Sequence, residues 1–249
     1  MSRLFTILLA ALAVSCATKP ELPYPSVQYK APKGGKVEMY MISHASVAVC
    51  FKDFVIQVDP VGKMGQKEND YSVFPKADLI LITHEHGDHY DPATIEALSK
   101  EGTVVLLNPA TQAKFGKGEA IANWEKRKVG PVEISAVPAY NISEGSLNYH
   151  PKARGDNGYI LDFNGFKVYF SGDTEDIEEM ATFGPVDVAF LAANKPFTMS
   201  PDQCVNAAKT IQPKVLIPYH LSQTNMQEIK DKLDADNSGI EVLLFEELR

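Results

Sequence analysis

Three of the six histidines in this 249-residue chain fall within the six residues His84-Glu85-His86-Gly87-Asp88-His89. The six residues before them, Asp-Leu-Ile-Leu-Ile-Thr, are mostly apolar and β-branched, which predicts a buried strand that ends where the histidines begin. We expect Gly87 to supply the backbone freedom for a tight turn there. Imidazoles and carboxylates at a rigid strand end can surround a metal ion in fixed geometry, so the segment predicts a metal site.

The spacing of these residues narrows the kind of metal site. His84-Glu85 could begin the helical His-Glu-x-x-His pattern of zinc proteases, but the residue four positions after His84 is Asp88, which excludes that pattern. His84 and His86 are two residues apart, so on an extended segment they point the same way and can bind one metal ion. Asp88 and His89 follow the turn and can reach a second ion. The alternative to a metal site is an exposed, charged turn.

The string His-x-His-x-Asp-His resembles the signature of the metallo-β-lactamase superfamily, whose members bind one or two metal ions at such a loop. Three further segments are similar to superfamily motifs, in the expected order. The resemblance makes Asp173, in Ser-Gly-Asp-Thr after a strand, a metal-bridging carboxylate and, with Asp88, a catalytic residue. It makes His220, at the end of another apolar strand, a ligand of the second metal. Asp59, in Val-Asp-Pro, corresponds to an aspartate that orients neighbouring groups.

The third ligand of the first metal has two candidates. Relatives resembling N-acylphosphatidylethanolamine-hydrolysing phospholipase D place a histidine about where Asn141 stands, whereas the nearest downstream histidine in this chain is His150. The segment also resembles a bacterial subgroup of metal-dependent hydrolases with few assigned substrates. We therefore predict His150 as the ligand. If it is only a surface-loop histidine, Asn141 or a water would complete the site.

The sixth histidine, His44, stands in Ile-Ser-His-Ala-Ser. Relatives resembling L-ascorbate-6-phosphate lactonase carry a similar Gly-His-Ala, and this chain has Ser43 where that glycine usually stands. A hydrogen-bonded core histidine and a histidine at the pocket edge both fit, and we do not predict His44 as a ligand. Further pocket-lining candidates, chosen only for their position beside motifs, are Tyr140, Tyr149, Asn194 and Lys195.

Length and composition fit one large α/β domain, because 249 residues with 45% apolar and 22% charged side chains can bury one sizeable core. Strands are expected near 36–42, 46–52, 54–59, 78–83, 103–107, 132–137, 158–163, 166–171, 187–191, 214–218 and 240–245. Helices are expected near 92–100, 175–182, 201–211 and 225–235, with Asp91 and Ser200 as N-caps of the first and third. This order implies two sheets with outer helices, in agreement with the four-layer αββα metallo-β-lactamase sandwich.

The first residues predict export. Arg3 precedes an apolar run, 4–14, that is too short to span a bilayer and is typical of a signal peptide. Ala-Val-Ser-Cys resembles the lipobox of bacterial lipoproteins, which would make Cys16 a lipidated N-terminus. Ordinary cleavage near Ala17 is the alternative. The expected location is the bacterial periplasm, either in solution or anchored to a membrane through the lipid.

These features divide the chain into a signal peptide at 1–16, a Pro-rich tether at 17–35 and a hydrolase domain at 36–249. In an oxidising compartment Cys50 and Cys204 could form a disulfide, but their apolar or helical surroundings favour buried thiols.

The charge balance limits the partners. The formal net charge of −8 becomes −9 when Arg3 leaves with the signal peptide, and an acidic domain is poorly suited to nucleic-acid phosphates. The dense basic run Lys126-Arg127-Lys128 is expected to be a solvated turn rather than a binding patch. We therefore expect a small-molecule substrate and no nucleic acid.

The ligand set predicts the chemistry. We expect two divalent metal ions, zinc first, with iron or manganese as alternatives. The first ion would be held by His84, His86 and His150, the second by Asp88, His89 and His220, with Asp173 bridging them. A metal-bound hydroxide, formed near pH 7, would cleave a small ester, lactone or amide. The alternatives are a phosphodiesterase of the phospholipase D-like type and a metal-binding lipoprotein without turnover.

Overall fold

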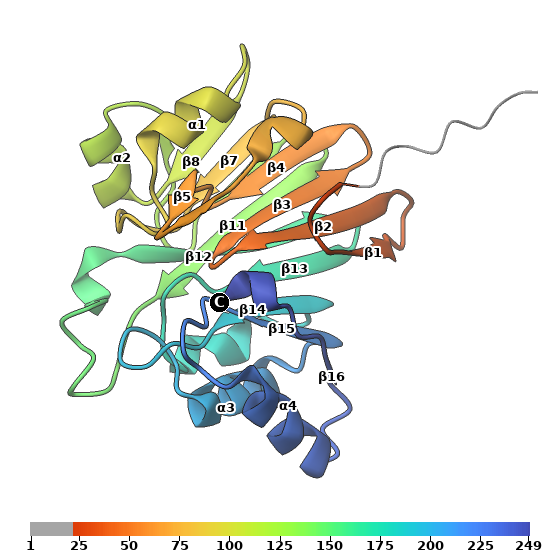
Figure 1. The fold of residues 1–249 in the computed structure, drawn as a ribbon, viewed down its shortest axis with the longest axis vertical. Coiled ribbons are helices and arrows are strands. Elements are labelled where there is room, and N and C mark those ends of the chain that lie inside the picture. Colours follow the sequence, from red (N-terminus) through yellow and green to blue (C-terminus); the bar gives the residue numbers. More distant parts are fainter. Residues whose placement is uncertain (1–21) are drawn as a thin grey trace, which may run out of the picture.

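The computed structural model describes residues 22–249, which form two seven-stranded sheets (Figure 1). In spatial order, the first sheet contains β1 (Ser26–Lys30), β2 (Lys36–Ser43), β3 (Ser46–Phe51), β4 (Phe54–Val58), β7 (Leu79–Ile82), β8 (Val104–Leu107) and β9 (Glu119–Ala120). The second contains β10 (Lys126–Val129), β11 (Val132–Ala139), β12 (Asp156–Phe163), β13 (Phe166–Phe170), β14 (Val188–Ala192), β15 (Val215–Tyr219) and β16 (Glu241–Val242). β5 (Lys63–Met64) and β6 (Lys67–Glu68) form a separate ribbon.

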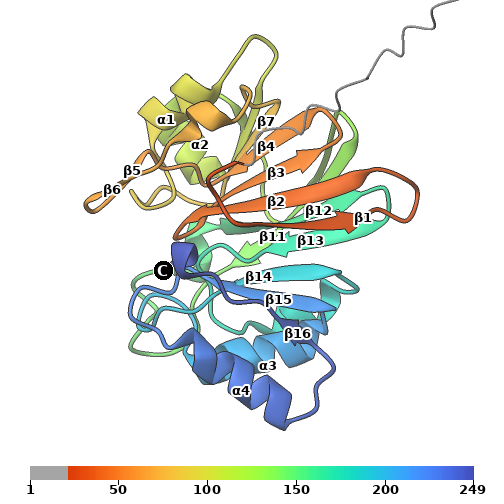
Figure 2. The same ribbon diagram turned by 45° about the vertical axis from the view of Figure 1, so that its right-hand side comes forward.

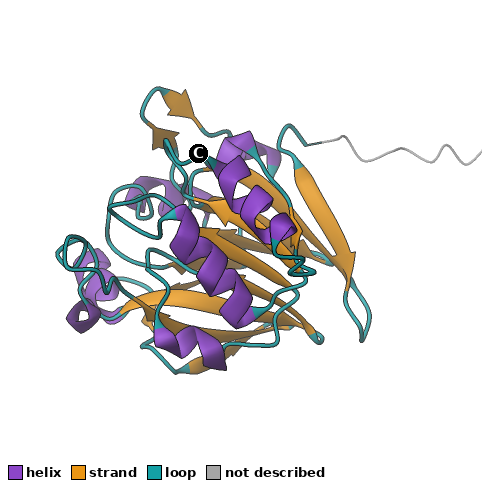
Figure 3. Ribbon diagram, turned by 90° about the horizontal axis from the view of Figure 1, so that it is seen from below, coloured by secondary structure: helices purple, strands orange, loops and turns teal. Residues whose placement is uncertain are grey.

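Helices cover the outer face of each sheet. They are α1 (Pro92–Leu98), α2 (Pro109–Phe115), α3 (Pro201–Ile211) and α4 (Met226–Ala235), with short 3₁₀ turns η1 (Tyr71–Val73), η2 (Lys152–Arg154), η3 (Glu178–Thr182) and η4 (Glu246–Leu248). Figure 2 shows α1 and α2 over the first sheet and α3 and α4 beneath the second, and Figure 3 shows the helices lying across the strands. This arrangement confirms the predicted αββα sandwich. Within 22–249 no helix has the length and apolarity needed to cross a membrane.

The core lies between the two sheets because alternate residues of each strand point inward. Val37 and Met39 of β2, for example, belong to the same buried cluster as Leu161 and Phe163 of β12. Two smaller clusters bury the outer faces of the sheets, the first against α1 and the second against α3 and α4. Each fully buried aliphatic or aromatic side chain contributes roughly 1.5–3 kcal/mol to the stability of the fold, so the three hydrophobic clusters hold the strands rigidly.

Parallel strands bring the motifs together. β4 pairs in parallel with β7, and β13 and β15 both pair in parallel with β14. The carboxyl ends of parallel strands meet at one edge of a sheet. Asp59, His84, Asp173 and His220 therefore follow strand ends at the edge where the sheets face each other.

The predicted domain boundary is wrong. Ser26–Lys30, within the expected tether, form β1, which pairs with β2 and packs Val27 and Tyr29 against the core. The alternation of these apolar residues with polar ones is a strand signal that the prolines on either side obscured. The expected signal peptide at 1–16, Cys16, Ala17 and the start of the tether lie outside the described residues.

Other segments also differ from the prediction. Lys126–Val129, expected as a solvated turn, are strand β10 at the edge of the second sheet. Pro109–Phe115, expected to be irregular, form α2, and the helix predicted at 175–182 is reduced to η3. No disulfide joins Cys50 to Cys204 in the described part of the chain. Cys204 is buried as predicted, which raises its thiol pKa to about 12, whereas Cys50 is only partly buried.

Candidate metal centre

The histidine-rich segment follows β7 directly and closes into a turn. The carbonyl of His86 accepts the backbone N–H of His89 (3.0 Å) and of Tyr90 (2.8 Å). A Cβ at Gly87 would have no other atom within 4 Å, and this glycine does not adopt a left-handed φ. The expectation that the turn needs the freedom of a glycine is therefore wrong, since the doubly accepting carbonyl forms the turn.

Histidine and aspartate side chains from several strand ends converge beside this turn. They form three groups, two of which share His84, and in each group the potential ligand atoms lie within 4.8 Å of one another. The histidine cluster contains His84, His86 and His150; the bridging cluster contains His84, His89 and Asp173; and the mixed cluster contains His44, Asp88 and His220. All seven residues predicted as ligands are thus brought together, with His44 in addition.

The carboxylate of Asp173 lies between these groups. Its Oδ2 is 3.2 Å from Nε2 of His150 and 3.3 Å from Nε2 of His220, and its Oδ1 is 3.3 Å from Nε2 of His89. One buried carboxylate therefore touches imidazoles from all three groups. This is the position that a ligand shared by two metal ions requires.

Gly172 places Asp173 there. Its φ is +60°, and a Cβ at this position would lie 2.5 Å from the carbonyl oxygen of Asn157. Its N–H donates to the hydroxyl of Tyr219 (2.9 Å), which ties the end of β13 to the end of β15. Only glycine fits both the backbone conformation and the close approach of β12.

Asp59 orients His89, as the sequence predicted. It is fully buried, and it accepts hydrogen bonds from the backbone N–H of Thr83 (2.8 Å) and the Thr83 hydroxyl (2.8 Å). Nδ1 of His89 lies 2.8 Å from Oδ2 of Asp59. Burial raises the pKa of Asp59, while His89 partly offsets this effect. With Nδ1 held by a carboxylate, Nε2 of His89 is directed at Asp173.

His150, and not Asn141, completes the histidine cluster. Nδ1 of His150 lies 3.2 Å from Oδ2 of Asp156, which leaves Nε2 facing the cluster. Asn141 is buried elsewhere, where its amide donates to the carbonyls of Ser146 (3.1 Å) and Phe197 (2.7 Å). The amide nitrogen of Asn141 therefore ties two loops together, while its Oδ1 is buried without a hydrogen-bond partner.

Two residues at the centre were not predicted as part of it: His44, which was considered for the pocket edge but not as a ligand, and Arg154. His44 lies at the turn between β2 and β3, with Nε2 3.4 Å from Oδ2 of Asp88 and its ring 3.9 Å from that of His220. The resemblance to Gly-His-Ala was the signal that could have identified it. Arg154 follows His150 by four residues, and its guanidinium donates to Nε2 of His86 (2.9 Å). No periodicity or motif marked that arginine.

The cluster sets the protonation states of its members. Burial acts to raise the pKa of Asp173, but His220 and His89 outweigh it and hold that pKa well below its usual value. Asp88 is likewise kept ionised, because hydrogen bonds with His220 and His44 lower its pKa more than burial raises it. Burial lowers the pKa of His84 well below its usual value. Burial acts to lower the pKa of His89 and of His150, but the carboxylates beside them outweigh it and raise both values, so these imidazoles pair with carboxylates in this structure. A metal ion needs ionised carboxylates and neutral imidazoles, so it would displace protons from His89 and His150.

The buried polar atoms of the centre fit divalent cations. Within the described residues, Nε2 of His84, Nε2 of His89 and Oδ1 of Asp173 are buried without a hydrogen-bond partner. Leaving such atoms unsatisfied costs about 1–3 kcal/mol each. They converge on one another, so a cation among them would satisfy several lone pairs at once. The mixed nitrogen and oxygen donor set suits zinc, iron or manganese.

The four residues predicted to line the pocket lie outside the three clusters and make contacts of their own. The hydroxyl of Tyr140 donates to Glu179 (2.7 Å), and Nζ of Lys195 lies 3.4 Å from Oε1 of Glu175. Tyr149 is partly exposed and packs edge-to-face on Phe197. Asn194 is a loop residue whose backbone N–H donates to a threonine hydroxyl.

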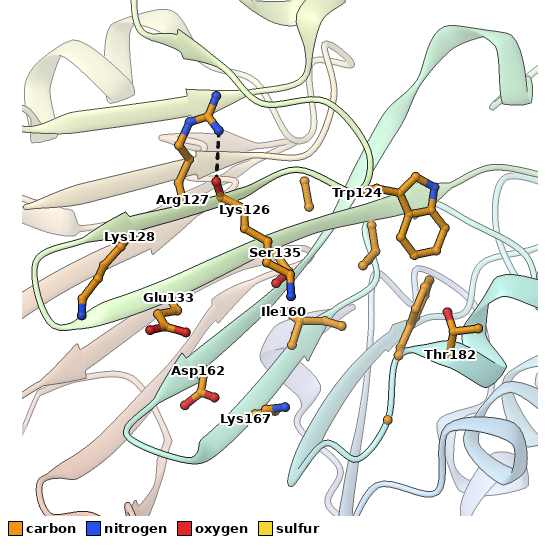
Figure 4. Close-up of a pocket in the computed structure, with 14 residues that line it drawn as sticks. Trp124, Lys126, Arg127, Lys128, Glu133, Ser135, Ile160, Asp162, Lys167 and Thr182 are labelled. Atoms are coloured by element: carbon orange, nitrogen blue, oxygen red, sulfur yellow. Dashed lines mark hydrogen bonds between the residues drawn. The ribbon is translucent and has the colours of Figure 1, made fainter.

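A separate groove of about 500 Å³ lies over the outer face of β10–β13 (Figure 4). None of the cluster residues lines it. Its charged lining residues are Lys126, Arg127, Lys128 and Lys167 with Glu133 and Asp162, so the lining is net basic. That the basic run binds no nucleic acid stays a prediction.

Sequence comparisons agree with the site. Residues 38–220 match the family described as Beta-lactamase superfamily domain. The chain is 35% identical over 155 residues to a UPF0173 metal-dependent hydrolase of Pyrococcus furiosus, a match that covers 59% of this chain and 68% of that protein. It is 31% identical over 183 residues to one of Pyrococcus abyssi, covering 68% and 80%.

Solved structures share the fold. A candidate metal-dependent hydrolase from Parabacteroides distasonis superposes with a TM-score of 0.84 at 43% identity, covering 90% of this chain and 99% of that one. A metallo-hydrolase from Ignicoccus hospitalis gives a TM-score of 0.71 at 22% identity, covering 86% and 96%. The second match supports the architecture alone.

Proposed function

This chain belongs to the UPF0173 metal-dependent hydrolases of the metallo-β-lactamase superfamily, and on that premise we propose that it hydrolyses a small ester, lactone or amide at a two-metal centre. The observation that carries the proposal is the place of Asp173, whose carboxylate contacts imidazoles of both sides of the site. Because the chain belongs to a family of metal-dependent hydrolases, it is an enzyme, and the alternative of a metal-binding lipoprotein without turnover is set aside.

The donor groups divide between two ions. His84, His86 and His150 would hold one. Asp88, His89 and His220 would hold the other, with Asp173 between them and His44 adjacent. When bound, the ions lower the pKa of a shared water toward about 7 and polarise the bond to be cleaved.

The protein's own residues prepare the site for that chemistry. Asp59 and Asp156 orient the imidazoles of His89 and His150 from behind. Asp88 is the most exposed carboxylate of the clusters, with 37% of its side chain accessible, and it is kept ionised. It therefore remains an anion at neutral pH and is placed to orient the attacking water by accepting a hydrogen bond from it.

The substrate would carry an apolar part. Among residues 22–249, four of the five exposed large apolar side chains belong to the loop that ends at His150 or to the loop tied to it, namely Ile142, Leu147, Tyr149 and Phe197. Such a cluster beside a polar centre suits the alkyl or aryl portion of an ester or lactone.

A phosphodiesterase is the second candidate. The observation that favours it is the guanidinium of Arg154 beside His86, because a phosphodiester carries a negative charge. Both the phospholipase D-like and the lactonase-like resemblance would fit this chain. Which substrates the chain hydrolyses distinguishes the two.

The test combines metal analysis with substrates. The purified chain, loaded with zinc or manganese, is assayed on a panel of lactones and p-nitrophenyl esters and on bis(p-nitrophenyl) phosphate. We expect turnover of esters or lactones. Activity confined to the phosphodiester would favour the second candidate, and failure on every substrate would reject both.

Two variants test the centre itself. His86→Ala and Asp173→Asn should lower bound metal and reduce kcat/KM at least about a hundredfold. Asp231→Asn, on the exposed face of α4, is the control for loss of a carboxylate and should behave as the native chain. Retention of both metal and activity in His86→Ala and Asp173→Asn would place the centre elsewhere.

We also propose that the enzyme is an exported lipoprotein using zinc. The support is the apolar run and the Ala-Val-Ser-Cys string at the N-terminus. Labelled fatty acid should be incorporated into the native chain in a bacterial host and not into Cys16→Ser. Elemental analysis of the purified protein identifies the metal.

A further inference from the structure

Arg154 lies against the histidine cluster. Its Nη1 donates to Nε2 of His86 (2.9 Å) and its Nη2 to Nδ1 of His150 (2.8 Å). Its Nε contacts both oxygens of Asp156 at 2.8 and 2.9 Å, and Nη2 also contacts Oδ2 of that residue. Only 17% of the arginine side chain is exposed, so the guanidinium is fixed at the edge of the site.

A metal ion and Arg154 compete for the rings of His86 and His150. An ion held by the histidine cluster binds one nitrogen of the neutral His86 ring and leaves a hydrogen on the other, so Nε2 can no longer accept from Nη1 of the arginine. An ion bound to Nε2 of His150 also requires the hydrogen of that ring to sit on Nδ1, where it points at Asp156. Nδ1 of His150 can then no longer accept a hydrogen bond from Nη2 of the arginine.

Metal binding therefore releases N–H groups of Arg154 toward the reaction site. The ion pair with Asp156 remains and anchors the guanidinium through Nε and one Nη2 hydrogen. A guanidinium has five N–H groups, and the planar fork matches two oxygens of one carboxylate or phosphate. The released donors need new oxygen acceptors, since leaving them unpaired in a mostly buried position is costly. Oε1 of Glu85 lies 3.8 Å from Nη1, beyond hydrogen-bond distance, and would compete with a substrate oxygen for that donor.

We propose that Arg154 recognises an anionic oxygen of the substrate, a carboxylate or a phosphate, next to the histidine cluster. This inference rests on the proposed function, because it specifies which substrates that centre accepts. It narrows the ester, lactone or amide to one that carries a negative charge near the bond to be cleaved.

A purely structural role is the alternative. In that case Arg154 would only neutralise the buried carboxylate of Asp156 and hold His150 in place. The two roles predict opposite effects on metal binding. Removal of a competing donor leaves metal affinity unchanged or raises it, whereas loss of a support for His150 lowers it.

The first experiment measures anion binding without turnover. Inorganic phosphate is titrated into the manganese-loaded full chain by calorimetry, for the native protein and for Arg154→Gln. We expect phosphate to bind the variant about ten- to a hundredfold more weakly, since charge-assisted, bidentate hydrogen bonds are lost. Arg127→Gln, which removes an exposed guanidinium paired with Glu125, is the matched control and should bind within about twofold of native.

Two readouts separate recognition from structure. Metal affinity, measured by competition with a chelator, should be equal to or tighter than native in Arg154→Gln. Arg154→Lys keeps the charge without the fork and should recover part of the phosphate affinity. Phosphate affinity within twofold of native in Arg154→Gln, or a loss of metal affinity in both variants, would overturn the proposal.

Substrate pairs identify the anion. p-Nitrophenyl acetate is neutral, mono-p-nitrophenyl glutarate carries a carboxylate and bis(p-nitrophenyl) phosphate carries a phosphodiester charge. Arg154→Gln should lower the kcat/KM ratio of the recognised anion over the neutral ester at least tenfold. If the loaded native chain hydrolyses none of them, the proposed function fails, while the phosphate titration still decides the role of Arg154.

Discussion

At the residue scale, the centre depends on carboxylates that touch no substrate. Asp59 is fully buried and holds His89 through a 2.8 Å contact to Nδ1. Asp59→Asn keeps an oxygen for the N–H of Thr83 but removes the charge that fixes the imidazole. We expect metal affinity or kcat to fall about ten- to a hundredfold. Metal content and turnover measure this, and Asp53→Asn, in the exposed β3–β4 turn, should change neither.

Glu175 gives a pH-dependent contribution to stability. Its carboxylate accepts the backbone N–H of Ile142 (2.8 Å) and Ser143 (2.6 Å). These bonds outweigh burial and lower its pKa, so the folded pKa lies below the unfolded one. The stabilisation is therefore complete above the unfolded pKa of about 4.5 and is lost as the pH falls through the folded value.

Glu175→Gln should accordingly lower the free energy of unfolding by about 1–3 kcal/mol at pH 7. Urea titrations of native and variant chains at pH 7 and pH 4 measure the difference, which should shrink at the lower pH. Glu178→Gln, on the exposed side of η3, is the control and should show no such trend. A difference that grows on acidification would contradict the assignment.

Sequence reasoning at this scale found ligands that a motif contains and missed neighbours that only the fold brings close. The strand-end residues His84, Asp173 and His220 could be placed because each follows an apolar run. The contact of His44 with Asp88 spans 44 residues of sequence, and the contact of Arg154 with His86 spans 68. No local pattern encodes such a contact.

At the scale of elements, the short terminal turn η4 supports the metal centre. The N–H of His44 donates to the carbonyl of Glu247 (3.1 Å), and the N–H of Leu221 donates to that of Leu248 (3.1 Å). Leu248 is fully buried in the core between the sheets. One apolar side chain thus fastens the chain end to the loops that carry His44 and His220.

Leu248→Ala should therefore act at two levels. The cavity should cost about 2–5 kcal/mol of stability, and the loosened loops should weaken metal binding as well. Chemical denaturation and metal competition measure these effects. Leu147→Ala, at a leucine that is 43% exposed, should change stability by no more than about 0.5 kcal/mol. An intact metal affinity in a destabilised Leu248→Ala would show that η4 serves the core alone.

The accuracy of the element predictions followed the strength of the local signals. The inner strands were placed within a few residues because their apolar runs are buried on both faces. The helix predicted at 175–182 is only the turn η3, and the spacing of three between Ile177, Met180 and Phe183 suits a 3₁₀ turn. α2 was overlooked although Asn108 caps it, Pro109 begins it and Gly116 ends it in the left-handed conformation.

At the scale of the whole molecule, the two sheets are joined at the site as well as through the core. Asp88 and His89 come from the first sheet, and His220 and Asp173 follow strands of the second. A cation held between them links the halves of the sandwich, whereas without one their buried donor atoms remain unsatisfied. Metal binding and folding should therefore be coupled.

Chelation should consequently lower the melting temperature. A ligand that binds only the native state at a hundred times its Kd stabilises it by about 2.7 kcal/mol, which corresponds to roughly 5–11 °C for a domain of this size. Scanning calorimetry with metal, with a chelator and after metal is restored measures the shift. In a His86→Ala, His220→Ala double variant, which removes a donor from each side of the site, most of the shift should vanish. Equal melting temperatures of the native chain with and without metal would mean that these side chains meet for a reason other than holding cations.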